Sequence, residues 1–184
     1  MKATVIALAL AAALISVGCG EGRAIFNVDV YSFIQGTGND TIPYLVPAGI
    51  SDTASNTPQE ISLPPGFGSS VVDSVRFVGN VNLVNVTGTG AIGFRLYIDT
   101  TSGGTLNASA LAINIPPTSV GPGADTVAVP ISQDLTTTLK DVFSSSSLWI
   151  RIEAIGVNPG ATPLAGNMVL TALQVRIVLQ DKIF

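Results

Sequence analysis

Apolar and polar side chains alternate one by one through much of this chain, and that alternation constrains the fold more than any other feature. Between residues 91 and 99, for example, every second side chain is a large apolar one. A period of two is typical of a β-strand that buries one face and exposes the other. The segments with this pattern are 25–34, 71–86, 91–99, 111–115, 126–131, 148–157 and 167–182, with shorter extended pieces at 44–46 and 60–63.

Turn residues separate these segments, and no fixed-period repeat joins them. Short alternating strands with Gly and Pro between them predict an all-β chain folded as an antiparallel β-sandwich, immunoglobulin-like or jelly-roll-like. The connector Thr87-Gly88-Thr89-Gly90 predicts that 81–99 is a hairpin. Apolar residues after Ser132 fall instead at helical spacing, which predicts one short helix near 133–143 with Ser132 as its N-cap.

The composition excludes several function classes. The chain has no histidine and one cysteine, so it cannot form a Ser-His-Asp triad, an imidazole metal site or an internal disulfide. Eight basic residues against twelve acidic ones give a net charge of −4, whereas nucleic-acid binders are usually basic. We therefore expect no cofactor, no metal site, no nucleic-acid partner and no enzymatic activity.

The N-terminus reads MKATVIALALAAALISVGC. Lys2 precedes an apolar run from Val5 to Ile15, which is too short to span a membrane and has the length of a signal h-region. The only cysteine follows in Ser16-Val17-Gly18-Cys19. This arrangement resembles the signal and lipobox of a bacterial lipoprotein; the resemblance covers only this segment and names no family for the rest of the chain.

The resemblance implies that Cys19 is acylated and becomes the first residue of the mature protein. Residues 1–18 are then a signal peptide, 19–24 a short lipidated linker and 25–184 a single sandwich domain. The alternative is an ordinary secretory signal cleaved elsewhere, with Cys19 incidental. Position 20 is Gly and not the Asp of an inner-membrane retention signal. The resemblance therefore favours the outer membrane in a cell with two membranes.

Three motifs that could carry chemistry have simpler interpretations. Gly88 to Gly93 matches the G-x-G-x-x-G spacing of dinucleotide-binding loops, but the next segment has strand periodicity, which favours a turn. The oxygen-rich run from Asp99 to Gly104 and the loop around Asp125 could each ligate an ion, although polar turns explain both.

Three aromatic residues fall opposite the apolar faces of their predicted strands: Tyr31, Tyr97 and Trp149. Exposed side by side, they would form a ligand face able to stack on sugars. The alternative is that they pack beneath the helix or a loop.

These observations favour a lipoprotein of the cell envelope, anchored to the membrane through its N-terminal lipid. Its sandwich is expected to be structural or binding rather than catalytic, and to contact an envelope protein or further copies of itself. The main alternative is a carbohydrate-binding module that uses Tyr31, Tyr97 and Trp149. A third hypothesis, an enzyme, would have to depend on carboxylates alone.

Overall fold

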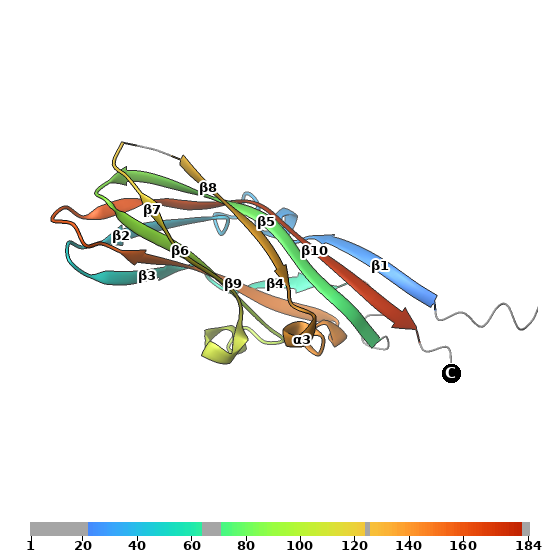
Figure 1. Ribbon diagram of the computed structural model, residues 1–184. Helices are drawn as coiled ribbons and strands as arrows, with labels where there is room; N and C mark the ends of the chain where they lie inside the picture. The colour runs from blue at the N-terminus through green and yellow to red at the C-terminus, as the bar shows by residue number, and fades with distance from the viewer. Residues whose placement is uncertain (1–21, 64–70, 124–125, 182–184) are drawn as a thin grey trace, which may run out of the picture.

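Two antiparallel sheets face each other in the computed structural model, which describes residues 22–63, 71–123 and 126–181 (Figure 1). None of the helices within these residues combines the length and apolarity needed to cross a bilayer. The first sheet has the order β1-β10-β5-β8, and β2 also pairs with β10. Its strands are β1 (Gly22–Asp29), β2 (Thr41–Val46), β5 (Val71–Thr87), β8 (Thr126–Asp134) and β10 (Leu164–Asp181).

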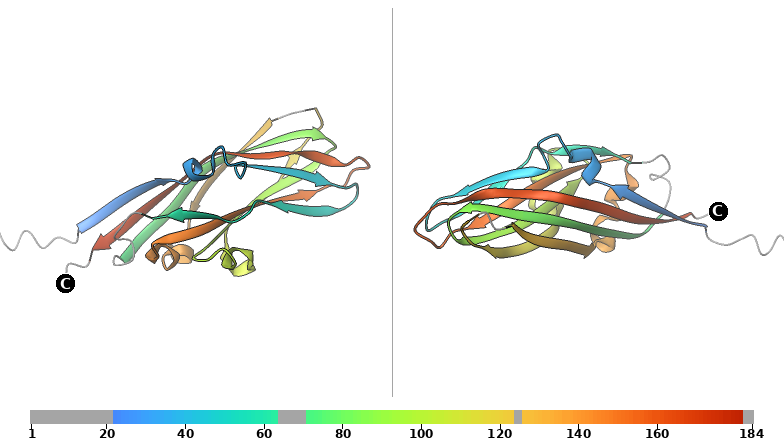
Figure 2. Two further views of the ribbon diagram at one scale, coloured as in Figure 1. Left: turned by 180° about the vertical axis from the view of Figure 1, so that it is seen from behind. Right: turned by 90° about the horizontal axis from the view of Figure 1, so that it is seen from above.

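The second sheet has the order β3-β9-β6-β7, and β4 also pairs with β9. Its strands are β3 (Ser51–Ser55), β4 (Gln59–Ser62), β6 (Gly90–Asp99), β7 (Leu111–Val120) and β9 (Ser147–Val157). Each sheet therefore has one edge divided between two short strands. Figure 2 shows β10 lying between β1 and β2 on one side and β5 on the other.

The strand order is that of a jelly roll. When each divided edge counts as one strand, the chain has eight strands, four in each sheet. The first strand pairs with the eighth, the second with the seventh, the third with the sixth and the fourth with the fifth. This is the arrangement made by rolling up one long antiparallel hairpin. The predicted all-β sandwich is confirmed, and its topology is jelly-roll-like rather than immunoglobulin-like.

Both divided edges have a local cause. Between β1 and β2 the chain leaves the sheet as α2 (Tyr31–Ile34), which buries Ile34, so the predicted strand 25–34 ends at Asp29. Between β3 and β4 the side chain of Asn56 replaces a backbone group: its Oδ1 accepts from the N–H of Ile152 at 2.7 Å. The backbone N–H of Asn56 donates in return to the Ile152 carbonyl at 3.1 Å.

Every proline within a described strand lies on a sheet edge. Pro43 is in β2, Pro116 and Pro117 are in β7, and Pro130 is in β8. Proline has no N–H to donate to a neighbouring strand, so it is tolerated at an edge and excluded from a central strand. For that reason β7 continues to Val120 through both prolines, where the sequence predicted that it would end at Ile115.

The predicted helix near 133–143 is shorter than expected. Strand β8 continues to Asp134, and the helical turns are α3 (Thr136–Leu139) and the 3₁₀ turn η4 (Val142–Ser144). Ser132 is therefore in a strand and is not an N-cap, since residues with low helix propensity yield here to sheet pairing. The predicted packing is present: Leu135, Leu139 and Phe143 are buried, and the ring of Phe143 lies 6.4 Å from that of Phe77.

The predicted hairpin over 81–99 is wrong, because β5 and β6 lie in different sheets. The connector crosses from one layer to the other at Gly88, whose φ is +75°. A Cβ at Gly88 would lie 2.5 Å from the carbonyl oxygen of Pro163. Gly88 is thus required both for its left-handed backbone and for the close approach of the β9–β10 connection.

Gly88→Ala should lower the free energy of unfolding by about 3 kcal/mol, because the left-handed backbone costs a side chain about 1–2 kcal/mol and the clash adds to that. Gly38→Ala is the matched control. Gly38 has φ +81° with nothing within 4 Å of an added Cβ, so only the backbone cost of about 1 kcal/mol applies. Urea titration of both variants measures the difference, and equal losses would contradict a packing role for Gly88.

Two buried asparagines hold the connections at the Gly88 end of the sandwich. Asn85 donates to the carbonyls of Gly88 and Gly121, and its Oδ1 accepts from the Tyr44 hydroxyl at 3.3 Å. Burial raises the pKa of Tyr44 to about 12. Asn158 donates to the carbonyls of Val46, Pro47 and Thr162 at 2.9–3.1 Å.

Candidate functional site

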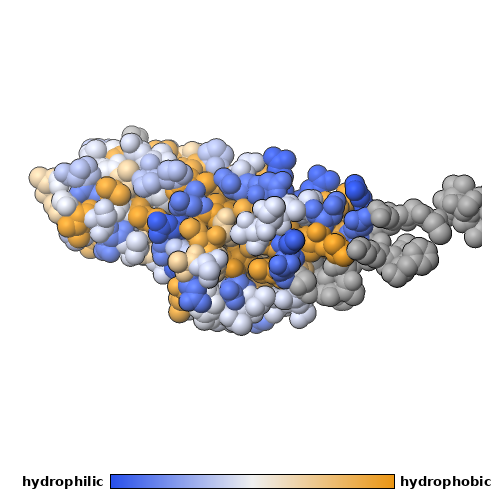
Figure 3. Space-filling view, turned by 60° about the horizontal axis from the view of Figure 1, so that its bottom comes forward, coloured by the Kyte–Doolittle hydropathy of each residue, from blue (hydrophilic) through white to orange (hydrophobic). Residues whose placement is uncertain are grey.

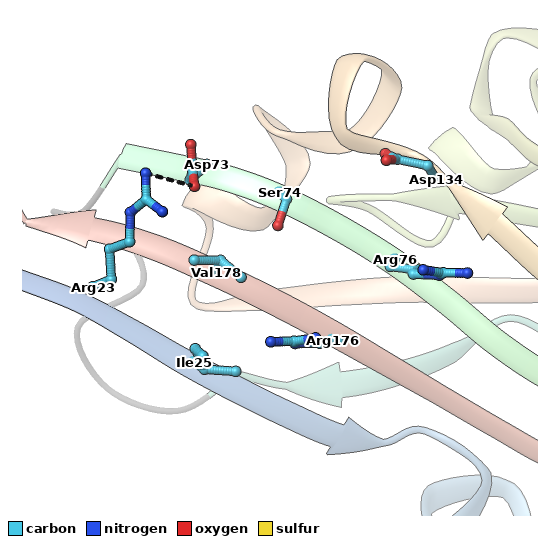
Figure 4. A pocket seen from close by; sticks show the side chains of 8 residues that line it. All are labelled: Arg23, Ile25, Asp73, Ser74, Arg76, Asp134, Arg176 and Val178. Carbon is cyan, nitrogen blue, oxygen red and sulfur yellow. Dashed lines mark ion pairs between the residues drawn. The ribbon is translucent and has the colours of Figure 1, made fainter.

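The outer face of the first sheet carries an open groove of about 370 Å³ at the end where the chain enters β1 (Figure 4). Antiparallel register places Arg176 of β10 directly opposite Arg76 of β5, while Asn27 of β1 faces Arg176 from the other side. We call this site the arginine groove; its lining residues are Arg23, Ile25, Asp73, Ser74, Arg76, Asp134, Arg176 and Val178.

A β-bulge contributes one of these residues. Ser74 pairs with Val178 and Val72 pairs with Leu179, so Asp73 is the extra residue in β5. A bulge lets the strand present two successive residues where the partner presents one. Val72 can therefore pack on the core while Asp73 reaches the groove and pairs with Arg23 at 3.8 Å.

The three arginines of the groove are unequally paired. Arg23 has Asp73, and Arg76 donates to the Ser132 hydroxyl at 3.3 Å. Arg176 has no ion pair or hydrogen bond to any residue that the structure describes. Like charges directly opposite each other on a sheet are destabilising. The Arg76–Arg176 pair therefore has unused capacity to bind a negative charge.

Asp134 faces Arg76 across the sheet but is occupied by another partner. Its Oδ1 accepts from the hydroxyl of Thr136 at 2.7 Å and from the Thr136 N–H at 3.0 Å. These hydrogen bonds, aided by the charge of Arg76, hold the pKa of Asp134 below its usual value. Asp134 is therefore ionised at neutral pH, and the groove still has three positive charges against two negative ones.

The groove combines cationic with apolar surface. Ile25, which lines it, is 54% exposed, and Val78 on the same outer face is 49% exposed. In Figure 3 hydrophilic residues gather at the end of the molecule where the grey trace begins, with hydrophobic residues beside them. Guanidinium groups bind phosphate and carboxylate oxygens in a bidentate manner. This site is therefore suited to an anion that carries an apolar part.

The outer face of the second sheet has its own charged cluster, but there each charged side chain has an ionic partner. Glu153 accepts from Arg95 at 3.2 Å, from Arg151 at 3.0 Å and from the Tyr97 hydroxyl at 3.2 Å. The guanidinium of Arg151 lies 4.0 Å from the centre of the Tyr97 ring and donates to the Thr105 carbonyl. Because the carboxylate and both cations have partners, this cluster is a structural network.

The three aromatic residues predicted as a ligand face do not form one. Tyr97 and Trp149 share the outer face of the second sheet, but Tyr97 is only 7% exposed, with the guanidinium of Arg151 over its ring. Tyr31 lies on α2 beside the first sheet and packs against the core. The predicted alternation does not extend to Tyr31, because strand β1 ends two residues earlier. The three aromatic side chains therefore do not lie side by side on one face, as the sugar-stacking surface would require.

The predicted ion-binding and lipidation residues either form a turn or lie outside the described residues. Asp99 closes a polar turn, since its Oδ1 accepts from the N–H and hydroxyl of Thr101 at 3.0 and 3.1 Å. Asp125 and Cys19 lie outside the described residues. Within the described ranges no three Asp, Glu, Cys or His side chains are grouped so that they could hold a metal ion.

Sequence reasoning missed the arginine groove. The alternation within 167–182 is consistent with an outward position for Arg176, but it does not connect Arg176 to Arg76, one hundred positions earlier. A signal was present: three of the chain's five arginines, Arg23, Arg76 and Arg176, stand on strands of one sheet. Sheet register is needed to bring these positions together.

Comparison with known proteins leaves the family open. No family model matches the chain, and no curated protein matches it. Among solved structures, the infectious bursal disease virus Gx strain structure aligns over 86% of this chain and 40% of its own, with 12% identity and a TM-score of 0.39. Dimeric latent PorU from Porphyromonas gingivalis aligns over 89% of this chain and 14% of its own, with 10% identity and a TM-score of 0.33.

Latent aurone synthase, a polyphenol oxidase, aligns over 76% of this chain and 26% of its own, with 8% identity and a TM-score of 0.28. The chain thus spans 40% or less of the length of each of these three proteins. With TM-scores below 0.5, these likenesses assign neither a family nor a function to the chain.

Proposed function

We propose that this protein is a lipoprotein of the cell envelope, anchored through acylated Cys19, whose jelly-roll domain binds an anionic ligand without catalysis. The binding site is the arginine groove. The anchor is inserted in the outer membrane in a cell that has two membranes. An envelope component is the expected partner.

The observation that carries the proposal is the position of the groove beside the N-terminal end of the domain. Strand β1 begins at Gly22, and Arg23 already lines the groove. Arg23 comes four positions after Cys19 in the sequence, a span of at most ~14 Å. An anchor at Cys19 would therefore hold the groove close to the phosphate-bearing headgroups of the membrane.

Acylation is tested by removing the thiol. When the full chain is expressed in a bacterium that processes lipoproteins, Cys19→Ser should move it from the membrane fraction to the soluble fraction. Two or more acyl chains at about 0.8 kcal/mol per buried CH₂ make anchoring effectively stable, and the variant lacks them all. Fractionation followed by detection of the protein measures the shift.

Gly20→Ala is the control, because it keeps the cysteine and should leave the protein in the membrane fraction. Intact mass of the membrane-extracted protein should correspond to a chain that starts at Cys19 and carries acyl groups. An unmodified thiol at Cys19, or a chain that starts at another residue, would contradict the proposed anchor.

A further inference from the structure

We infer that the arginine groove docks on the phosphate groups of anionic lipids in the membrane that holds the protein, so that the domain lies against that membrane with the outer face of its first sheet. The inference rests on the proposed anchor at Cys19 and specifies the ligand of the same groove. The anchor alone would not define how the domain is oriented on the membrane; the groove would fix one orientation.

The geometry of the chain brings the groove within reach of the headgroups. Arg23 is at most ~14 Å from the proposed anchor, and Arg176 lies opposite Asn27, four residues further along β1. Arg76 is the next position across the sheet. All three guanidinium groups therefore belong to the part of the domain nearest the anchor, on one face of one sheet (Figure 4).

The distribution of charge on the domain favours attraction between the groove and lipid phosphate. The whole chain has a net charge of −4, and an acidic protein is repelled by an anionic surface unless its positive charges are gathered on the approaching face. The groove gathers three of the five arginines. Its two carboxylates are engaged, Asp73 with Arg23 and Asp134 with Thr136, whereas Arg176 faces Arg76 without a counter-ion among the described residues.

The apolar side chains next to the arginines favour a membrane, and not a free anion, as the ligand of the groove. Ile25 is 54% exposed, Val78 is 49% exposed, and Val178 lines the groove between the arginine pair and Arg23. Cationic side chains interspersed with exposed aliphatic ones suit the headgroup boundary, where phosphate lies directly above acyl chains. A free phosphate ion would use the guanidinium groups and leave these apolar side chains in water.

Among the described residues, the outer face of the second sheet has no arginine that lacks an ionic partner. Both arginines of the second sheet's outer face, Arg95 and Arg151, are already paired with Glu153. Docking is therefore expected on the first sheet only, which makes the orientation of the domain the quantity to measure.

The test uses the full lipidated chain, extracted from cells and reconstituted into vesicles whose acyl chains carry bromine, a quencher of tryptophan fluorescence. Trp149→Phe removes the single natural tryptophan, and Val78→Trp places a reporter on the outer face of the first sheet. Vesicles of phosphatidylcholine are compared with vesicles of equal parts phosphatidylcholine and phosphatidylglycerol. Arg76→Gln with Arg176→Gln removes the central pair, and Lys140→Gln, outside the groove, is the charge-matched control for Arg176→Gln alone.

We expect strong quenching only in the anionic vesicles, declining as salt is added. The double arginine variant should lower the ratio of docked to undocked protein about thirtyfold, on the basis of about fivefold for each arginine lost. Lys140→Gln should leave the ratio within about twofold. Arg176→Gln alone serves if the double variant loses its far-ultraviolet circular dichroism spectrum, with an expected loss of about fivefold.

Equal quenching in neutral and anionic vesicles, with the protein still attached to both, would overturn the inference and leave the anchor intact. So would release of the reporter by millimolar inorganic phosphate at constant ionic strength, which would identify a small anion as the ligand. A chain that fails to float with any vesicle after extraction would instead contradict the proposed lipid anchor itself.

Discussion

Asn158→Ala should lower the free energy of unfolding by about 3–5 kcal/mol, one of the largest losses that a single substitution could cause in this domain. Asn158 is 1% exposed, and its amide donates to the carbonyls of Val46, Pro47 and Thr162. Its Oδ1 accepts from the N–H of Gly160 at 2.9 Å. Alanine leaves these backbone groups without a partner, and each buried unsatisfied group costs about 1–3 kcal/mol.

The effect reaches beyond one loop because of where the carbonyls belong. Val46 ends β2 of the first sheet, whereas Asn158 directly follows β9 of the second sheet. The Asn158 side chain therefore joins the two layers at the end of the sandwich. Urea titration followed by intrinsic fluorescence measures the loss. Asn107→Ala, at an exposed asparagine without a side-chain cap, should change stability by less than about 0.5 kcal/mol.

An Asn158→Ala protein whose stability stays within about 1 kcal/mol of the parent would show that water replaces the amide at little cost. That result would remove the layer-joining role assigned to Asn158. Asn158→Asp separates the two halves of the amide, since it keeps the acceptor for Gly160 but loses the donors. It should be at least as destabilising as alanine, because the buried carboxylate would also face three carbonyl oxygens.

Glu153→Ala should cost about 3–4 kcal/mol, because it leaves the buried guanidinium of Arg151 without its counter-ion. The side chain of Arg151 is 8% exposed and that of Glu153 is 13% exposed, so solvent compensates little for the loss. Tyr97 and Arg95 lose their acceptor at the same time. The free energy of unfolding by urea should fall accordingly.

A second substitution tests whether the unpaired charge is the cause. Arg151→Met combined with Glu153→Gln removes the buried charge together with its partner and keeps an acceptor for Tyr97. Such a double replacement of a buried pair is often close to neutral, so it should be at least 1–2 kcal/mol more stable than Glu153→Ala. If the double variant is no more stable, the loss comes from packing and not from the isolated charge.

The strands of this fold were largely predictable from the sequence because a half-buried strand imposes its period locally. The alternation in 91–99 and 148–157 corresponds closely to β6 and β9, and the inward residues Phe94 and Ile152 are buried. The same local information could not assign strands to sheets. A Gly-rich connector has the same sequence pattern whether it reverses the chain within one sheet or carries it to the other sheet. At Gly88 the connector packs closely against Pro163, which is distant in the sequence.

The alternation of side chains also did not predict where the edge strands β1 and β7 end. Proline in β7 suggested the end of a strand, but the strand continues because β7 is an edge strand and both prolines lie at a bulge, where they pair with no residue of β6. Tyr31 continues the alternation of β1 and is nevertheless helical, since burial of Ile34 on α2 outweighs one more pair of strand residues.

The candidate site was the least predictable part, because its residues are far apart in the chain. Arg23, Arg76 and Arg176 become neighbours only through the pairing of β1, β10 and β5. The bulge at Asp73 is likewise a property of two strands together. Tyr97 illustrates the reverse case: its outward position was correctly predicted, but the guanidinium of Arg151 lies over its ring and it is buried.

The central place of β10 has a consequence for the order in which the molecule can assemble. This strand is the shared partner of β1, β2 and β5, and it is the last strand of the described chain. While synthesis or export proceeds from the N-terminus, strands β1, β2 and β5 lack the strand that joins them. The first sheet therefore cannot form until β10 is present. Non-local pairing of this kind folds slowly. On the proposed route through the envelope, that delay would keep the chain extended and able to pass through a translocation pore until its final strand has followed.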